Sequence, residues 1–487
     1  SRNRENYSIN QRTLFDENYN LALTQNLKNK DIPEGGAKGT ILPDIDTNPR
    51  IAFQKYVDAL LDLMIPGSTP GIKEAIVDLH GKEEILFLGP DEGTAEFMDW
   101  GAYRARERGA SWWKSFTTGK SAATLGGVPH DVFGMTSRSV RAYKLGIYRH
   151  LGLREEDVTK VQTGGPDGDL GSNEILLSTD KTIAVIDGSG VVWDLEGLNR
   201  EELVRLAKAR KTVSHFDTSK LSKQGFRVLV DERDVTLPSG EHVVSGFTFR
   251  NLACRRFKAD ILVPCGGRPE TINVNEVQVM CAHGTSPYKY IVEGANLFIT
   301  RTARVDLEKR GVILYPDASA NKGGVTSSSL EVLVGLSLTD KEYMEWMCYK
   351  NGEPTPFYLG YVRDIQHIIE RNAAAEFEAI WRENELTGRP RSVISTDLST
   401  VLNDLSQQIE GTSLYDQEHI RCAVLAQVFP KTLVEAVGGL EELEKRVPSA
   451  YLRSAFAAQL AAGFVYAKGP RASHVDFYNH ITALTTA

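Results

Sequence analysis

Apolar residues recur every three or four positions in several stretches of the chain, and this spacing predicts amphipathic helices. One such helix spans residues 12–28, and Asn48-Pro49 is typical of the cap and first turn of another, over residues 49–64. After about residue 340 the pattern is helical throughout. We expect these stripes to pack in the core, and their apolar positions are Phe15, Tyr19, Leu23, Leu27; Phe53, Val57, Leu60, Leu61, Met64; Ile365, Ile369, Phe377, Trp381; Leu398, Leu402, Leu405, Ile409; and Leu452, Phe456, Leu460, Phe464.

The middle of the chain has a different pattern. Short runs of β-branched and apolar residues at 161–163, 183–186, 261–263 and 312–315 alternate with helical or loop stretches, which predicts a parallel α/β unit. Residues 226–230 and 243–249 flank the turn signal Leu237-Pro238-Ser239-Gly240. We therefore expect these two segments to pair as a small antiparallel hairpin inserted between strands of the main sheet.

Composition narrows the class of protein. The chain has 487 residues, with 56 Lys and Arg against 64 Asp and Glu, so its formal net charge is -8. That balance argues against a nucleic-acid partner, and no apolar run approaches the roughly 20 residues of a membrane span. The five cysteines include no Cys-x-x-Cys pair, and no targeting signal is seen, so a cytoplasmic or mitochondrial location is expected. No histidine pair has the spacing of metal ligands, so no metal site is expected.

A glycine-rich turn follows the run at 161–163. The sequence Thr163-Gly164-Gly165-Pro166-Asp167-Gly168-Asp169-Leu170-Gly171 precedes a helix-like stretch, and Asp187 stands 19 positions after Gly168, behind the next apolar run. Strand, glycine turn, helix start and distant carboxylate together predict a dinucleotide site, although the glycines depart from Gly-x-Gly-x-x-Gly. The residues expected to contact the cofactor are Gly165, Gly168, Asp169, Leu170, Gly171 and Asp187. No Arg or Lys follows Asp187, so a 2′-phosphate would meet a carboxylate without a cation, which favours NAD over NADP.

Two further segments carry candidate acid/base groups. Lys38 lies within Pro33-Glu34-Gly35-Gly36-Ala37-Lys38-Gly39, where small neighbours allow a substrate to approach and desolvation would lower the pKa of the amine. Asp99 ends a second segment, residues 89–101, among Phe97, Met98 and Trp100. If it lies beside such a lysine, it could move protons.

The order of these segments resembles the glutamate dehydrogenases, in particular the large NAD-specific type of fungi, over nearly the whole chain to about residue 335. The resemblance assigns the catalytic lysine to Lys38 and the catalytic aspartate to Asp99. In the segment 126–140 it places Thr136 on the nicotinamide carboxamide. The loop Glu293-Gly294-Ala295-Asn296 and the closing motif 316–328 are also similar; they imply Asn296 and Asn321 at the cofactor and Ser328 on the side-chain carboxylate of the substrate.

Two features depart from the family pattern. The lysine expected about a dozen residues before the catalytic one falls at Asn26, which leaves Lys28 or Lys30 to hold the α-carboxylate. The family's Gly-Gly-Ile-Arg-like motif is expected upstream of Ser1, so the chain resembles the C-terminal catalytic part of the large type.

The resemblance implies NAD-dependent oxidative deamination of L-glutamate to 2-oxoglutarate and ammonium. It implies a Rossmann-like doubly wound NAD domain at 141–322 and a second α/β substrate domain at 1–140. A helical C-terminal region at 323–487 returns to the substrate domain, and hinges lie near residues 140 and 325. A homo-oligomer, tetramer or hexamer, is expected, without a nucleic-acid or membrane partner. The alternatives are another amino-acid dehydrogenase, leucine- or phenylalanine-like, and a non-catalytic NAD-binding interaction protein.

Overall fold

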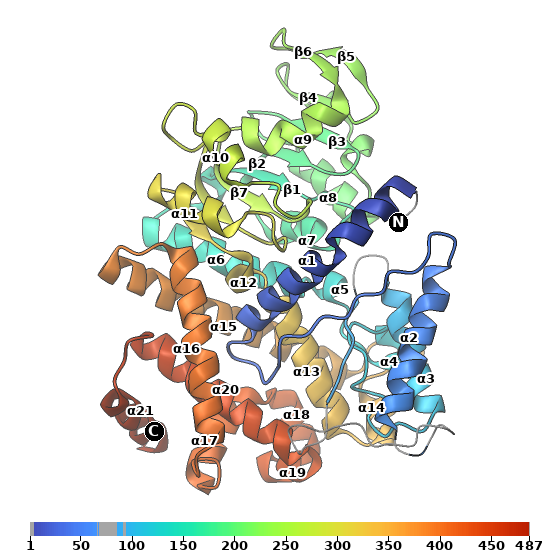
Figure 1. Cartoon of the computed structure of the whole chain (residues 1–487), viewed down its shortest axis with the longest axis vertical. Coiled ribbons are helices and arrows are strands. Elements are labelled where there is room, and N and C mark those ends of the chain that lie inside the picture. Colours follow the sequence, from blue (N-terminus) through green and yellow to red (C-terminus); the bar gives the residue numbers. More distant parts are fainter. Residues whose placement is uncertain (1–3, 66, 68–84, 91–93, 487) are drawn as a thin grey trace.

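The main sheet has seven strands in the order β4-β3-β2-β1-β7-β8-β9 (Figure 1). The computed structural model describes residues 4–65, 67, 85–90 and 94–486. The strands of this sheet are β1 (Thr159–Thr163), β2 (Lys181–Ile186), β3 (Gly190–Trp193), β4 (Phe226–Leu229), β7 (Ala259–Pro264), β8 (Tyr288–Val292) and β9 (Ile313–Tyr315).

Five of these strands run parallel, from β2 through β1, β7 and β8 to β9. These strands are almost wholly buried because helices cover both faces, which explains the apolar stretches of β2 and β7. Chain order reverses between β1 and β7, and such a switch point is where doubly wound sheets bind ligands. The predicted doubly wound α/β fold is confirmed.

The predicted hairpin has the wrong partners. Strand β4 pairs antiparallel with β3 and so extends the main sheet, while β3 pairs antiparallel with β2. The turn at Leu237–Gly240 instead connects β5 (Arg233–Thr236) and β6 (His242–Ser245), and residues from Gly246 onward start a helix. The Ser245 side chain accepts a hydrogen bond from Thr248 N, which explains why the strand ends there.

Helices make up most of the remaining structure. Those before and within the sheet are α1 (Arg4–Lys28), α2 (Pro49–Met64), α3 (Ala95–Glu107), α4 (Ala122–Leu125), α5 (His130–Phe133), α6 (Met135–Leu151), α7 (Asp169–Leu177), α8 (Arg200–Ala209), α9 (Gly246–Arg256), α10 (Val274–Met280) and α11 (Arg301–Lys309). Those after it are α12 (Asp317–Ala320), α13 (Gly323–Ser337), α14 (Asp340–Trp346), α15 (Pro356–Thr387), α16 (Arg391–Glu410), α17 (Glu418–Val428), α18 (Lys431–Val437), α19 (Leu440–Arg446), α20 (Ser449–Lys468) and α21 (His474–Thr486). Short 3-10 turns lie at Glu155–Asp157, Val213–His215 and Thr218–Lys220.

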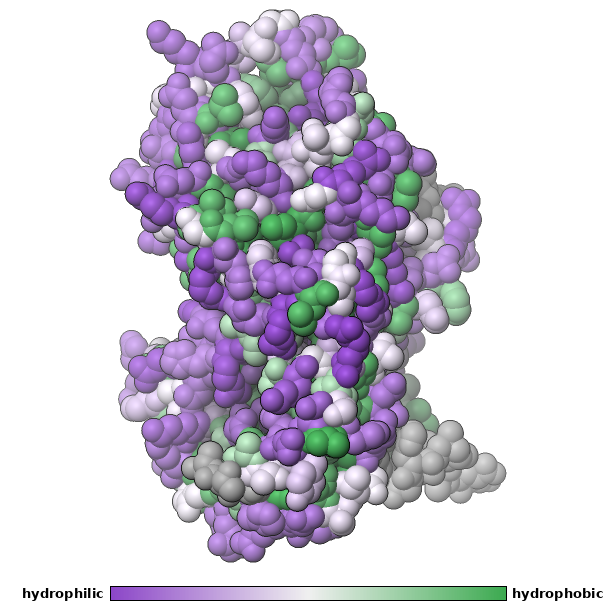
Figure 2. All heavy atoms as spheres, turned by 90° about the vertical axis from the view of Figure 1, so that its left-hand side faces the viewer, coloured by the Kyte–Doolittle hydropathy of each residue, from purple (hydrophilic) through white to green (hydrophobic). Residues whose placement is uncertain are grey.

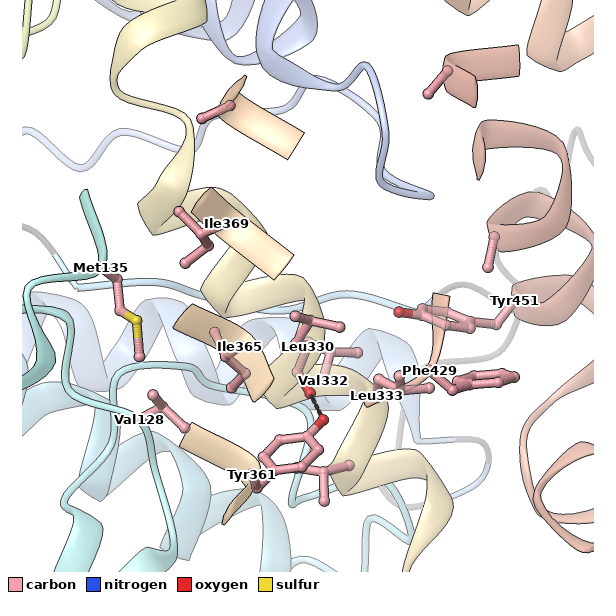
Figure 3. Close-up of a cluster of buried hydrophobic side chains, with 14 of the residues drawn as sticks. Val128, Met135, Leu330, Val332, Leu333, Tyr361, Ile365, Ile369, Phe429 and Tyr451 are labelled. Atoms are coloured by element: carbon pink, nitrogen blue, oxygen red, sulfur yellow. Dashed lines mark hydrogen bonds between the residues drawn. The ribbon is translucent and has the colours of Figure 1, made fainter. Parts of the chain in front are cut away.

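The C-terminal helices share one hydrophobic core with the first part of the chain. Val57 and Leu61 of α2, Trp113, and the stripes of α15, α16 and α20 belong to the same cluster of buried side chains. Figure 3 shows its centre, where Leu330 of α13 packs against α15 and Tyr361 donates a hydrogen bond of 2.7 Å to the Leu330 carbonyl. The C-terminal region therefore packs against elements near the start of the chain and fixes the position of α13.

The first predicted stripe is only partly core. Phe15 and Tyr19 are 77% and 60% exposed, and their rings stack on each other at 6.5 Å. Helix α1 has buried residues only toward its end, at Thr24 and Lys28, so the core prediction is wrong for its first half.

Figure 2 shows another face of the molecule, on which hydrophilic side chains predominate.

The start of the chain contributes little sheet. Among the described residues before β1, β pairing is limited to a parallel bridge between Leu88 and Thr117. Of the helices described here, none is long and apolar enough to cross a membrane.

Candidate active site

The glycine turn after β1 is shaped by very close backbone contacts. Gly164 has a φ of +85°, and a Cβ atom there would lie 2.5 Å from the backbone N of Gly266 at the end of β7. A Cβ atom at Gly171 would lie 2.3 Å from the carbonyl oxygen of Gly165. These glycines are therefore required because the turn packs directly on α7 and on the neighbouring strand end.

Gly168 is less crowded than the other glycines of this turn. It precedes the first turn of α7, and the nearest atom to a Cβ built there is 3.7 Å away. A helix start offers backbone N–H groups and a partial positive charge to an anion. The residues here therefore fit the pyrophosphate of a dinucleotide, with Asp169, Leu170 and Gly171 forming the helix start.

Asp187 follows β2, where a ribose-binding carboxylate is expected. Its Oδ1 accepts hydrogen bonds from Ser189 N (2.8 Å), Ser189 Oγ (2.7 Å) and Gly190 N (3.2 Å), and its Oδ2 accepts one from Val213 N (2.7 Å). Burial raises the pKa of this carboxyl. Oδ2 can accept one more hydrogen bond. It lies close to the glycine turn, since a Cβ atom on Gly165 would lie 2.4 Å from it. A fixed acceptor for a ribose hydroxyl therefore stands beside the turn.

A cation from a distant part of the chain lies near Asp187. Arg250 of α9 lies close enough to Asp187 for the two charges to interact, although burial and the charge of Arg268 lower the pKa of Arg250. The inserted segment brings this cation from far along the chain, so the residues next to Asp187 could not reveal it. A preference for NAD therefore rests on the carboxylate and not on the absence of a cation.

Lys28 joins the end of α1 to the loops that follow β8 and β9. Its Nζ donates to Asn296 Oδ1 at 2.8 Å, and the Asn321 amide donates to the same oxygen at 2.8 Å and to the Gly294 carbonyl at 2.8 Å. Burial lowers the pKa of Lys28 to about 8, against the opposing charge of Asp317. Three predicted site residues are thus brought together. The Lys28 ammonium can donate three hydrogen bonds, and the structure shows it donating one, to Asn296.

Lys30 has a different environment. Its Nζ donates to Glu376 Oε1 (2.5 Å), Ser319 Oγ (3.0 Å) and the Ala318 carbonyl (3.3 Å), so all three hydrogens are used. Lys322 contacts the other oxygen of Glu376 at 2.9 Å and Asp31 at 2.5 Å. This buried ionic network attaches the segment after α1 to α15 and leaves Lys30 without a hydrogen for a substrate.

The two predicted acid/base residues are not paired in this structure. Lys38 is exposed, as are the residues around it from Gly35 to Ile41, so the expected desolvation is not supplied by this chain as it stands. Its charge nevertheless acts on two residues near the end of α1: it adds to the burial that lowers the pKa of Lys28, and it opposes the burial that raises the pKa of Glu34. Asp99 is half-buried in α3, accepts a hydrogen bond from Ser121 N at 2.8 Å, and has its pKa raised by burial. Residues 91–93 of the same motif lie outside the described residues.

Ser328 lies on α13, which begins at Gly323, two residues after Asn321. Thr118 Oγ1 donates to Ser328 Oγ at 3.0 Å, and His130 Nε2 lies 3.3 Å from that oxygen. Thr136 of α6 is close to the same helix, because a Cβ atom on Gly324 would lie 2.8 Å from its hydroxyl. Helix α13 therefore connects the predicted nicotinamide and side-chain ends of the site.

A second buried ion pair supports this helix. Lys120 Nζ donates to Glu331 Oε1 at 2.6 Å, and Glu331 Oε2 accepts from Gly119 N (2.9 Å) and Val128 N (3.0 Å). The pair fastens the loops around Thr118 and His130 to α13.

Sequence reasoning missed this pair, as well as Glu376 and His130. A charged residue inside the apolar run Leu330-Glu331-Val332 was the available signal for Glu331. No group of three or more potential metal ligands occurs among the residues that the structure describes.

A doubly wound sheet with a glycine turn at its switch point and a carboxylate after the second strand defines a dinucleotide-binding α/β enzyme. The family model for Glutamate/Leucine/Phenylalanine/Valine dehydrogenase matches residues 126–388. The chain belongs to this family, and the fold and the resemblance predicted from its motifs are confirmed.

Relatives agree with this assignment. The NAD-specific glutamate dehydrogenase of Neurospora crassa is 54% identical over 99% of this chain and 46% of its own length, and that of Saccharomyces cerevisiae is 48% identical over 96% and 44%. The chain thus spans about half the length of these relatives. Among solved structures, the hetero-hexameric glutamate dehydrogenase of Thermus thermophilus has a TM-score of 0.54 at 18% identity, covering 80% of this chain and 77% of that one, which supports the fold.

Proposed function

We propose that the protein catalyses NAD-dependent oxidative deamination of L-glutamate to 2-oxoglutarate and ammonium. The observation that carries this proposal is that Lys28, Asn296 and Asn321 meet just before α13, while Ser328 lies on that helix among polar side chains. A leucine or phenylalanine side chain would leave Thr118, His130 and Ser328 facing an apolar group, which is unfavourable for buried hydrogen-bonding groups. The names of the relatives support the same substrate.

Each residue has a defined task in this reaction. When bound, NAD would supply the hydride acceptor for oxidation at the α-carbon of glutamate. Lys28 holds the α-carboxylate, Ser328 holds the side-chain carboxylate, and Asn321 and Thr136 orient the nicotinamide. Lys38, as the neutral amine, removes a proton from the water that attacks the iminium carbon, and Asp99 gives a proton to the departing amine. Because Lys38 is exposed, this chemistry requires closure of the site over the bound substrate.

The substrate is tested by the appearance of NADH absorbance in the full-length protein. L-Glutamate should give strong turnover with NAD, while L-leucine and L-phenylalanine should give little. Equal or better turnover of either apolar amino acid would favour a dehydrogenase for that substrate, and NAD binding without any turnover would favour an interaction protein.

Lys28→Met is expected to raise the KM for glutamate about 10–100-fold, because the variant loses a charge-assisted hydrogen bond to the α-carboxylate. The KM for NAD should change less. Because the pKa of Lys28 is about 8, its ammonium is lost above that pH. In the unmodified enzyme the KM for glutamate should therefore rise as the pH increases beyond 8, and this rise should be absent in the variant. Lys30→Met is the matched control. It should mainly lower the midpoint of thermal unfolding, because Lys30 pairs with buried Glu376. An increase in the KM for glutamate as large as that of Lys28→Met would contradict the assignment.

Asp187→Ser is expected to weaken NAD binding about tenfold and NADP binding less, because only NAD keeps the ribose hydroxyl that the carboxylate accepts from. The measurement is a titration of each cofactor by isothermal calorimetry. Ser189→Ala removes the hydroxyl that donates to Asp187 Oδ1 but keeps the carboxylate, so it should change both affinities little. If the ratio of the NAD and NADP affinities is unchanged in Asp187→Ser, the carboxylate does not bind the ribose.

The assembly is also proposed. We propose a homo-oligomer, tetramer or hexamer, on the basis of the family resemblance. Light scattering coupled to size-exclusion chromatography measures the number of subunits directly.

A further inference from the structure

The hydroxyl of Ser328 has two close neighbours besides any substrate. Thr118 Oγ1 lies 3.0 Å from Ser328 Oγ and donates to it, and His130 Nε2 lies 3.3 Å from the same oxygen. Thr118 and Ser328 are buried, while His130 is half-buried. The family resemblance assigns a role to Ser328 but none to His130.

The capacity of a hydroxyl for hydrogen bonds limits how this cluster can be arranged. A serine oxygen accepts two hydrogen bonds and donates one. Thr118 already fills one acceptor position. If the His130 ring carries its proton on Nε2 and donates, the second position is filled and the single Ser328 proton must point elsewhere. If the ring accepts instead, the Ser328 proton is used within the cluster and none remains for a ligand.

We propose that His130 is a positioning residue that directs the Ser328 proton toward the side-chain carboxylate of the substrate, and so sets specificity for an acidic amino acid. This inference rests on the proposed function. It adds to that function a residue that selects the substrate by keeping a donor free.

The surroundings hold the ring in place. His130 starts α5, whose Asp131 carbonyl accepts from Asn173 Nδ2 at 2.6 Å and from Arg210 at 3.3 Å, and the ring packs beside Gly324, where a Cβ would lie 3.5 Å from Nδ1. The charged groups that face it are Glu331 from α13, Asp131 from its own turn and Asp169 from α7. Burial lowers the pKa of His130 in spite of these three carboxylates, so the ring is neutral near pH 7 and has a single N–H to place.

The test compares L-glutamate with L-norvaline, which has the same three side-chain carbons but no terminal carboxylate, in the full-length enzyme. His130→Ala should raise the KM for glutamate about tenfold, the value of one well-placed hydrogen bond, and leave turnover of norvaline unchanged. His130→Gln keeps an amide donor in place of Nε2–H and should restore most of the affinity for glutamate. His242→Ala, on the exposed hairpin strand β6, is the matched control and should change neither substrate.

The outcomes distinguish failure of the role of His130 from failure of the proposed function. If His130→Ala lowers activity on glutamate and norvaline alike, the histidine has only a structural role and the inference is overturned. It is also overturned if the KM for glutamate does not change, or if His130→Gln is as impaired as His130→Ala. An unmodified enzyme that produces no NADH from glutamate would overturn the proposed function, and this inference with it.

Discussion

Lys38→Ala is expected to reduce glutamate-dependent NADH formation by about a thousandfold or more, in the range typical for loss of a general base. Neither neighbouring lysine can replace it, because Lys28 is bonded to Asn296 and Lys30 to Glu376. NAD affinity should not change, since Lys38 lies outside the glycine turn and the Asp187 pocket. Steady-state kinetics and a calorimetric NAD titration measure the two quantities separately.

Two controls make the Lys38 result specific. Lys38 is exposed, so the alanine variant should unfold at the same temperature as the unmodified protein. Lys55→Ala removes an equally exposed lysine from α2 and should retain full activity. Normal turnover by Lys38→Ala would remove the lysine from the mechanism.

Glu376→Ala is expected to lower the free energy of unfolding by about 3–5 kcal/mol, because it leaves the buried ammonium groups of Lys30 and Lys322 without their carboxylate. The Glu376 side chain is fully buried and also accepts a hydrogen bond from Ser319 Oγ at 2.5 Å. The loss should appear in denaturant unfolding followed by circular dichroism. Activity should fall as well, since the segment that carries Lys28 would be released from α15.

The same network gives a pH dependence of known sign. Burial alone would raise the pKa of Glu376, but contact with Lys30 and Lys322 lowers it to about 2, below its ordinary value of 4.5. The stabilisation is therefore fully present above pH 4.5 and is lost as the pH falls toward 2. Glu376→Gln should show a weaker loss of stability across that interval.

Glu378→Ala provides the matched control on the same helix. Glu378 pairs with Arg149 and His150 at the surface, where an ion pair contributes about 0–1 kcal/mol. A Glu376→Ala variant as stable as Glu378→Ala would show that the buried network does not anchor the segment after α1.

Local patterns predicted the secondary structure well but not all of its pairing. The buried runs at β2, β7 and β9 were recognisable because parallel strands covered on both faces are largely apolar. Strand β1 is buried as well, although its sequence, TKVQT, is mostly polar. Strand β4 was assigned to the wrong partner, because the choice between β3 and residues 243–249 depends on tertiary packing that the turn signal does not encode. The Phe15–Tyr19 stripe has the same limitation: spacing predicts a helix face but not what covers it.

The site divides in the same way. Asn296, Asn321 and Ser328 come from recognisable motifs, whereas the sequence left Lys28 and Lys30 as alternatives. The structure shows that Lys28 meets Asn296 and Asn321. The buried pairs Lys30–Glu376 and Lys120–Glu331 join residues more than two hundred positions apart, and nothing local distinguishes such carboxylates from surface ones. The exposure of Lys38 could not be read from the sequence either, because desolvation of that loop depends on what closes over it.

We propose that Lys38 acts at the substrate carbon in a closed site. A structure of the full-length protein with NAD and 2-oxoglutarate bound tests it most directly, through the distance from Lys38 Nζ to the ketone carbon. We expect contact between them, within about 3.5 Å or through one water molecule, with Asn321 beside the nicotinamide. A ternary complex in which Lys38 still lies exposed to solvent, away from both ligands, would contradict it.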